Sequence, residues 1–249
     1  MSNKLSGKIA LVTGGSRGIG AAIALELAQD GADVAISYAA SQDKANEVVK
    51  QIEALGRRAI AIKADQADTE QVKGLVQDTF NHFGQLDILV NNAGVWATAQ
   101  VNDAEPDEAA LTRQQAVNIN GVVTAVREAS KVMNDGGRII SIGSVLGTRT
   151  PWAGLSDYSA TKAAVAAYTR GWARDLGPKG ITVNNVQPGP TDTDMNPADG
   201  DFANVVKPNI PLGRYGQPKE IAAAVSFLAS PAASYITGVS LDVDGGVNA

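Results

Sequence analysis

Short apolar runs alternate along the whole chain with longer segments of mixed polarity. Each run is rich in aliphatic and β-branched residues, which is typical of strands buried on both faces of a parallel sheet. The runs occupy residues 8–13, 34–38, 59–63, 86–90, 138–142, 181–186 and 239–243.

The segments between these runs have the spacing of amphipathic helices. One of them begins after Ser41, a suitable N-cap, carries apolar residues every three or four positions, and ends at Gly56. The expected helices occupy residues 21–29, 42–55, 69–83, 106–133, 158–176 and 218–229.

Alternating strands and helices predict an α/β fold with a doubly wound parallel sheet, the Rossmann fold. We expect about seven strands, with helices on both faces and the first strand near the centre. No linker, repeat or low-complexity tract divides the sequence, so residues 1–249 are expected to form a single domain.

The composition makes several kinds of chemistry improbable. The sequence has no cysteine, which excludes disulfides, thiolate nucleophiles and cysteine-bound metals and suits a reducing cytoplasm. The single histidine, His82, lies in a helical segment and is expected at the surface. We therefore expect neither a histidine-based triad nor a metal site.

The charge argues against two classes of partner. A net charge of −5 and a pI of about 4.9 disfavour nucleic acid and anionic membranes, because both require a basic surface. Residues 1–8 are polar, and no run approaches the roughly 18 apolar residues of a membrane span. We expect a soluble cytoplasmic protein without a signal peptide.

A glycine-rich turn follows the first strand and opens the first helix. Its glycines are Gly14, Gly18 and Gly20. Glycines let the backbone approach a diphosphate, and a helix N-terminus offers free N–H groups and partial positive charge. The spacing differs from G-x-G-x-x-G, and a tight turn without a ligand is the alternative.

A serine, a tyrosine and a lysine lie where the strand at 138–142 gives way to the next helix. Tyr158 and Lys162 are four residues apart, so they share one helix face within about 6 Å. An ammonium at that distance is expected to lower the tyrosine pKa toward the working pH. Ser144 could hold a substrate oxygen beside the phenol. Because a Y-x-x-x-K spacing also occurs in ordinary amphipathic helices, the pair alone does not distinguish a catalytic role from a structural one.

Other polar clusters also follow strands, and the carboxyl ends of parallel strands are where ligands bind in open sheets. The clusters are residues 13–20, Asp65, 91–94, Ser144 and 188–189. Several clusters on one edge favour a binding site over turn chemistry alone.

The motifs in this order resemble those of the short-chain dehydrogenase/reductase family over essentially the full length. They are T-G-G-S-R-G-I-G at 13–20, N-N-A-G at 91–94, V-N-I-N-G at 117–121, I-G-S at 142–144, Y-S-A-T-K at 158–162 and Q-P-G-P-T-D-T-D at 187–194. The resemblance implies an oxidoreductase that transfers hydride between a nicotinamide cofactor and a ketone or secondary alcohol.

The resemblance also implies roles for individual residues. The catalytic residues would be Asn118, Ser144, Tyr158 and Lys162, with Tyr158 as general acid/base, Lys162 on the nicotinamide ribose and Asn118 in a proton relay. Asn118 is preferred to Asn120 only by the family pattern. The expected cofactor-binding residues are Gly14, Ser16, Arg17, Gly18, Ile19, Gly20, Ser37, Tyr38, Ser41, Asp65, Gln66, Asn92, Ala93, Gly94, Tyr158, Lys162, Pro188, Gly189, Thr191 and Thr193.

The cofactor preference follows from a missing carboxylate. NAD-selective sites place an Asp or Glu about 20 residues beyond the glycine turn, to accept the ribose 2′-OH. Residues 37–41 contain none, whereas Arg17, with Ser37 or Ser41, could bind a 2′-phosphate. We therefore expect NADP(H) to be preferred, with NAD(H) possible.

The substrate is expected to be a small-molecule ketone or alcohol. Trp96, Trp152 and Met195 lie in loops above the expected pocket and are candidate substrate contacts, whereas Asp192 and Asp194 are expected to order their loop. Two alternatives stay open: a 3-oxoacyl-(acyl-carrier-protein) reductase, and a nucleotide-binding regulator without turnover. Long apolar helices and the resemblance favour a homotetramer.

Overall fold

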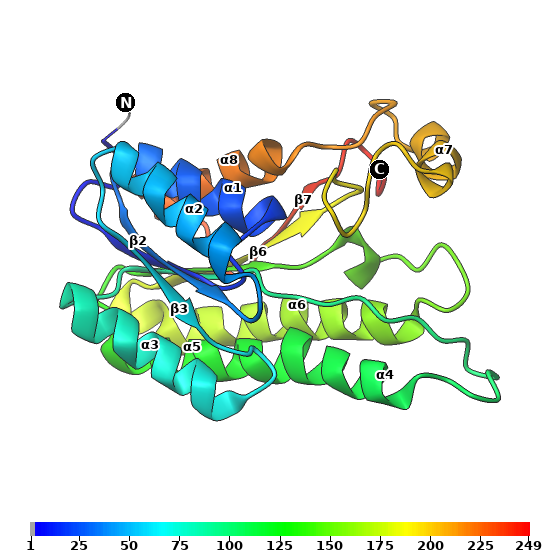
Figure 1. The fold of residues 1–249 in the computed structure, drawn as a ribbon, viewed down its shortest axis with the longest axis horizontal. Coiled ribbons are helices and arrows are strands. Elements are labelled where there is room, and N and C mark those ends of the chain that lie inside the picture. Colours follow the sequence, from blue (N-terminus) through cyan, green and yellow to red (C-terminus); the bar gives the residue numbers. More distant parts are fainter. Residues whose placement is uncertain (1–2) are drawn as a thin grey trace.

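A computed structural model describes residues 3–249, and its centre is one parallel sheet (Figure 1). The strands lie in the order β3-β2-β1-β4-β5-β6-β7, and every neighbouring pair is parallel. They are β1 (Ile9–Val12), β2 (Asp33–Tyr38), β3 (Ala59–Lys63), β4 (Ile88–Asn91), β5 (Arg138–Ile142), β6 (Thr182–Pro188) and β7 (Ser240–Val243). The predicted Rossmann fold, with seven strands and the first strand inside the sheet, is confirmed.

Helices cover both faces of the sheet. In Figure 1, α1, α2 and α8 lie on one face and α3, α5 and α6 on the other. The helices are α1 (Gly18–Gln29), α2 (Gln42–Ala54), α3 (Thr69–Phe83), α4 (Glu108–Gln115), α5 (Val122–Val132), α6 (Ser156–Leu176), α7 (Asp201–Val206) and α8 (Pro218–Ala229). Short 3-10 turns lie at Val145–Gly147, Gly177–Lys179, Lys207–Asn209 and Pro231–Ala233.

The two helix layers make two hydrophobic cores. Strand β1 supplies both, because successive side chains of a strand point to opposite faces. Ala10 and Val12 are buried in the core that also contains α1, α2 and α8, whereas Ile9 and Leu11 are buried in the core with α3 and α5. Burial on both sides explains why the inner strands read as continuous apolar runs, whereas no residue of the edge strands β3 and β7 is fully buried.

One predicted helix is interrupted. The sequence pattern favoured one helix over 106–133, but the structure has α4, then a wider π-helical turn at Ala116–Gly121, and then α5. This turn contains Asn118, and such turns often lie at functional sites. The short helix α7 was not predicted, because six residues leave too little room for a helical period to show.

None of the helices within residues 3–249 is long and apolar enough to cross a membrane.

Candidate active site

The glycine turn after β1 is fixed by hydrogen bonds to two neighbouring strands. Gly14 N donates to the Ser37 hydroxyl at the end of β2 (3.0 Å), and Asn92 Nδ2 after β4 donates to Gly14 O (3.1 Å). Gly14 and Gly18 have φ angles of 64° and 55°, a region that favours glycine. The turn is therefore preformed, and Ser37, expected to contact a phosphate, is buried and supports the turn.

The turn has the features of a diphosphate cradle. A Cβ on Gly20 would collide with Gly14 O and Asn92 Nδ2, so the backbone there is as close to its neighbours as glycine allows. Helix α1 begins directly at this turn, and no side chain of residues 3–249 caps it. Its first N–H groups and its dipole can therefore serve an anion.

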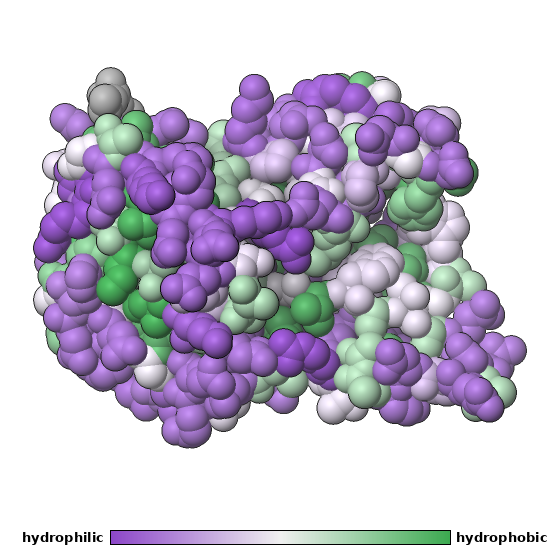
Figure 2. All heavy atoms as spheres, in the orientation of Figure 1, coloured by the Kyte–Doolittle hydropathy of each residue, from purple (hydrophilic) through white to green (hydrophobic). Residues whose placement is uncertain are grey.

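A cavity of about 1030 Å³ runs along the carboxyl ends of the strands. In Figure 2 the surface is hollowed beside α7, with apolar residues inside the hollow. All predicted site residues except Asn118 line this cavity: Gly14, Ser16, Arg17, Gly18, Ile19, Gly20, Ser37, Tyr38, Ser41, Asp65, Gln66, Asn92, Ala93, Gly94, Trp96, Ser144, Trp152, Tyr158, Lys162, Pro188, Gly189, Thr191, Thr193 and Met195.

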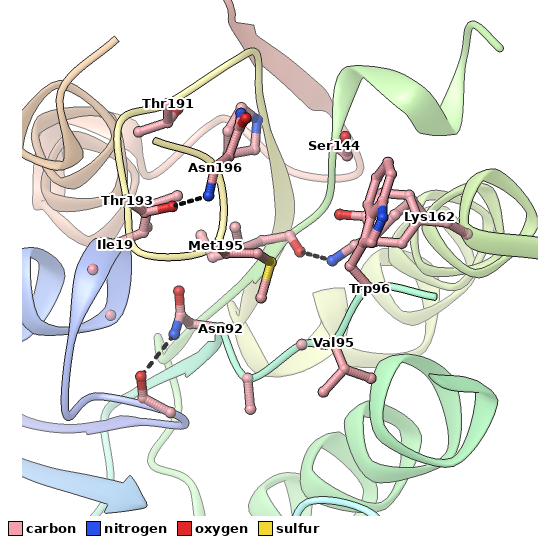
Figure 3. Close-up of a pocket in the computed structure, with 18 of the residues that line it drawn as sticks. Ile19, Asn92, Val95, Trp96, Ser144, Lys162, Thr191, Thr193, Met195 and Asn196 are labelled. Carbon is pink, nitrogen blue, oxygen red and sulfur yellow. Dashed lines mark hydrogen bonds between the residues drawn. The ribbon is translucent and has the colours of Figure 1, made fainter. Parts of the chain in front are cut away.

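Three of the predicted catalytic side chains share one wall of the cavity. Ser144 follows β5 and accepts a hydrogen bond from Leu146 N (3.1 Å), which fixes its hydroxyl at the turn. Tyr158 and Lys162 lie one helical turn apart on α6, and Lys162 Nζ is 5.6 Å from the centre of the Tyr158 ring. Figure 3 shows Ser144 and Lys162 at the same side of the pocket.

The titration of this pair differs from the sequence-based expectation. Burial raises the pKa of Tyr158 to about 12, against a smaller opposing effect of its hydrogen bond with Ser144. Burial likewise lowers the pKa of Lys162 to about 8. The expectation that Lys162 lowers the tyrosine pKa is not met in this structure, because burial of the phenol has the larger effect. The lysine ammonium donates to Ile142 O (3.0 Å).

Asn118 lies behind the cavity wall. Its amide joins two segments: Oδ1 accepts from Val95 N (2.9 Å), and Nδ2 donates to Val95 O (3.0 Å) and Thr161 Oγ1 (3.2 Å). A Cβ on Gly94 would come 3.5 Å from Asn118 Oδ1 and 3.6 Å from Lys162 Nζ, so only a glycine separates the two. Asn120, the alternative weighed from the sequence, is exposed.

The expected 2′-phosphate region contains a cation that sequence reasoning missed. Arg17 Nη1 and Lys44 Nζ both contact the same oxygen of Asp194, at 3.3 and 3.2 Å. Lys44 is in the first turn of α2. Because it lies far from the glycine turn in the sequence, no sequence pattern predicts that the two come together. Asp194, expected only to order its loop, ties that loop to α1 and α2.

The end of the predicted site next to β3 also holds an unexpected cation. Asp65 follows β3 and forms a two-pronged ion pair with Arg113 of α4, with N–O distances of 3.1 and 3.0 Å. This hydrogen bonding holds the pKa of the Asp65 carboxyl below its usual value. Gln66 is buried beside it, and its Nε2 has no partner among the described residues, which leaves a donor for a ligand.

Large apolar side chains surround the other end of the cavity. The Trp96 indole packs on the Tyr158 ring with centroids 4.4 Å apart, and Trp152 makes an edge contact with Phe202 of α7 at 5.7 Å. Met195 points into the pocket in Figure 3. Phe202 was missed because α7 was not predicted.

The chain is similar to known proteins over most of its length. Residues 14–248 match a family model described as Enoyl-(Acyl carrier protein) reductase. A 3-oxoacyl-(acyl-carrier-protein) reductase FabG of Staphylococcus aureus (strain Mu50 / ATCC 700699) is 42% identical over 247 residues, covering 96% of this chain and 98% of the relative.

Two further proteins are similar over nearly the whole chain. The cyclic-di-GMP-binding biofilm dispersal mediator protein of Escherichia coli (strain K12) is 42% identical over 244 residues, 98% of each chain. A crystal structure of a short-chain dehydrogenase from Burkholderia cenocepacia J2315 in complex with NADP has 52% identity and a TM-score of 0.96, covering 99% of this chain and 100% of that one. The chain therefore belongs to the short-chain dehydrogenase/reductase family, whose NAD(P)-dependent oxidoreductases interconvert alcohols and carbonyl groups.

Proposed function

We propose that this protein is a carbonyl reductase that uses NADPH to convert a small-molecule ketone into a secondary alcohol. One observation carries the proposal: the side chains of Ser144, Tyr158 and Lys162 line the same cavity as the preformed glycine turn. A substrate in this cavity can meet a proton donor while a dinucleotide lies across the sheet edge.

Tyr158 is the proton donor in this proposal. Its raised pKa keeps the phenol protonated at neutral pH, so it can give a proton to the carbonyl oxygen during reduction. Ser144, whose side chain hydrogen-bonds with Tyr158, orients that oxygen. When bound, NADPH supplies the hydride that reduces the carbonyl carbon.

Lys162 and Asn118 support the phenol. The lowered pKa of Lys162, about 8, lets its amine exchange protons near neutral pH. To return a proton to Tyr158 after reduction, its ammonium must release the Ile142 carbonyl to which it donates. Asn118 is a positioning residue in this proposal, because its amide fixes Val95 against Thr161 of the catalytic helix.

The preference for NADPH rests on the charges near β2. Residues 37–41 carry no carboxylate that would repel a 2′-phosphate, and Arg17 and Lys44 present two cations there. Similar proteins support this choice, since the Burkholderia structure contains NADP and another with 47% identity, a blue fluorescent protein from a metagenomic library, contains NADPH.

The aromatic end of the cavity favours a free, apolar ketone. Any carbonyl that reaches the Tyr158 hydroxyl lies beside Trp96, because the two rings pack together. The exposed surfaces of Trp152, Met195 and Phe202 add further apolar contacts at the mouth.

The test is a comparison of substrates with NADPH as cofactor. We expect purified protein to oxidise NADPH in the presence of an aryl ketone such as acetophenone, with formation of one alcohol enantiomer. If ketones are not turned over and acetoacetyl-acyl carrier protein is, the substrate is a carrier-bound 3-oxoacyl group and not a free ketone.

A 3-oxoacyl-(acyl-carrier-protein) reductase is the second candidate, favoured by the Staphylococcus relative of that name. An acidic carrier protein needs a cationic docking surface, and exposed Arg149 lies at this cavity. Its Nη1 already donates to Val247 O (2.7 Å). Replacement of Arg149 by Ala should weaken turnover of the carrier-bound substrate if this candidate is correct.

The third candidate is a regulator without turnover, for which the Escherichia coli relative is the precedent by name. The complete set of Ser144, Tyr158 and Lys162 argues for catalysis. Tight binding of cyclic-di-GMP with no reduction of either substrate would favour the regulator.

We also infer a homotetramer in the cytoplasm. Stacked Tyr168 and Trp172, with ring centroids 4.9 Å apart, place aromatic surface on α6, and Tyr168, Phe227 and Val239 are exposed. Such surface favours association. Sedimentation at micromolar concentration tests the tetramer, and a monomer would contradict it.

A further inference from the structure

Three charged side chains from distant parts of the chain meet at one point. Arg17 precedes α1, Lys44 lies in α2, and Asp194 lies in the loop after β6. The guanidinium and the ammonium contact one carboxylate oxygen, Oδ2 of Asp194, at 3.3 and 3.2 Å. Within residues 3–249, neither cation forms another ion pair.

This point lies at the β2 side of the cavity, away from the catalytic side chains. Arg17, Ser41 and Asp194 all line the cavity, and Ser41 follows β2, whereas Ser144 follows β5. Two other strands separate β2 from β5, which corresponds to about 14 Å at the usual strand spacing. A dinucleotide whose reactive end reaches Tyr158 would therefore have its adenosine ribose near Arg17.

The carboxylate makes the contacts that a phosphate would make. Hydrogen bonding from Lys44 and from Arg17 lowers the pKa of Asp194, so the group is an anion at neutral pH. Two cations directed at one anionic oxygen form a charge-assisted site for a phosphate monoester. All three side chains are more than half exposed, so an incoming anion can reach them.

We propose that Asp194 occupies the 2′-phosphate subsite as a built-in competitor, and that Lys44 is the second cation of that subsite. Binding of NADP(H) then displaces Asp194 from Arg17 and Lys44, whereas NAD(H), which lacks the phosphate, leaves the ion pairs intact. Asp194 thus reduces the preference for NADP(H) and sets how strongly the enzyme discriminates between NADP(H) and NAD(H). The inference rests on the proposed use of NADPH.

The first test removes the competitor. Binding of NADP⁺, NAD⁺ and adenosine 2′,5′-bisphosphate to the whole protein is measured by calorimetry, which does not depend on turnover. Because one exposed ion pair is worth up to about five-fold in an equilibrium constant and Asp194 forms two of them, Asp194→Asn should tighten both phosphate-bearing ligands about two- to ten-fold. The affinity for NAD⁺ should change less than about two-fold on the same scale.

A matched control separates this effect from a general loss of negative charge. Asp199 is exposed in the same loop and forms no ion pair in the described chain. Asp199→Asn should leave all three affinities nearly unchanged. Weaker or unchanged NADP⁺ binding in Asp194→Asn would overturn the competitor, because it would mean that the carboxylate positions the cations or does nothing.

The second test concerns Lys44. Lys44→Ala should weaken NADP⁺ and adenosine 2′,5′-bisphosphate several-fold and spare NAD⁺, whereas Lys50→Ala on the same helix should change neither. Equal effects of the two lysine substitutions would remove Lys44 from the subsite. If the wild-type protein binds NAD⁺ more tightly than NADP⁺, the proposed cofactor fails; if it prefers NADP⁺ and Asp194→Asn does not alter that preference, only this inference fails.

Discussion

The indole of Trp96 packs against the phenol ring of Tyr158, with their centroids 4.4 Å apart and their planes tilted by 52°. A side chain in the loop after β4 therefore forms the wall beside the proposed proton donor. A substrate whose carbonyl oxygen reaches that phenol must place one of its substituents near the indole.

Trp96→Ala is expected to change which ketones are reduced. An aromatic contact contributes roughly 0.5 to 1.5 kcal/mol, so kcat/KM for acetophenone should fall about 2- to 12-fold relative to that for a small methyl ketone. Val101→Ala, a change in the same loop at a fully exposed side chain, is the control. An equal loss for both ketones would show that Trp96 only supports the fold.

The glycine turn should tolerate no side chain at Gly20. Its Cβ would collide with backbone oxygen of Gly14 and with Asn92, so we expect Gly20→Ala to destabilise the protein by about 1 to 3 kcal/mol and to weaken NADP⁺ binding. Gly74→Ala on α3 is the matched control, since its Cβ would meet nothing within 4 Å. That change should stabilise the helix by up to about 1 kcal/mol. Thermal denaturation measures the stability of both variants, and calorimetry measures their affinity for NADP⁺. Normal NADP⁺ binding by Gly20→Ala would contradict the close packing of the glycine turn at this position.

Stability should depend on pH through Lys162. Its pKa falls from 10.5 to about 8 on folding, so between these values the unfolded chain binds more protons and stability rises with pH. Below about pH 8 the folded protein must hold a buried ammonium, and this cost is relieved as pH increases. Denaturant unfolding at several pH values should show the rise in the wild type and a smaller one in Lys162→Met.

Tyr158 gives the opposite dependence of stability on pH, and this limits the pH range in which the effect of Lys162 is visible. The pKa of Tyr158 rises from 10.0 to about 12 on folding, so stability falls with pH between these values. The gain from Lys162 should therefore be visible from about pH 8 to 10. A wild-type profile parallel to that of Lys162→Met over this range would contradict the lowered pKa of Lys162.

Arg17→Ala should erode the preference for NADPH. A charge-assisted hydrogen bond is worth roughly 1.5 to 3 kcal/mol, so kcat/KM with NADPH should fall about 10- to 150-fold, with little change for NADH. Steady-state kinetics with one ketone and both cofactors measure this. A clear preference of the wild type for NADH would overturn the assignment of Arg17.

The sequence predicts the sheet well because its inner strands are buried on both faces and its helices on one. The sequence predicts less about segments in which the apolar residues show no regular spacing. The π-helical turn around Asn118 is hidden inside a helical pattern, and α7 with Phe202 is too short to show one. The meeting of Lys44 with Asp194 depends on the path of the loop after β6, which no local pattern records.

For the candidate site too, some features follow from sequence patterns and others depend on the three-dimensional structure. Motif spacing brought Ser144, Tyr158 and Lys162 together, and the structure places them on one cavity. The tyrosine pKa could not be inferred from a four-residue spacing, because it depends on burial of the phenol and, to a smaller extent, on its hydrogen bond with Ser144.

The most direct measurement of the central claim compares the wild type with Tyr158→Phe for acetophenone reduction by NADPH, with NADP⁺ affinity determined for both. Removal of the phenolic proton should lower kcat by at least about 10² to 10⁴-fold, the usual contribution of general acid catalysis, and leave NADP⁺ affinity within about two-fold. Tyr235→Phe, at a fully exposed tyrosine, should behave as the wild type. Near wild-type turnover by Tyr158→Phe would contradict the assignment of Tyr158 as proton donor.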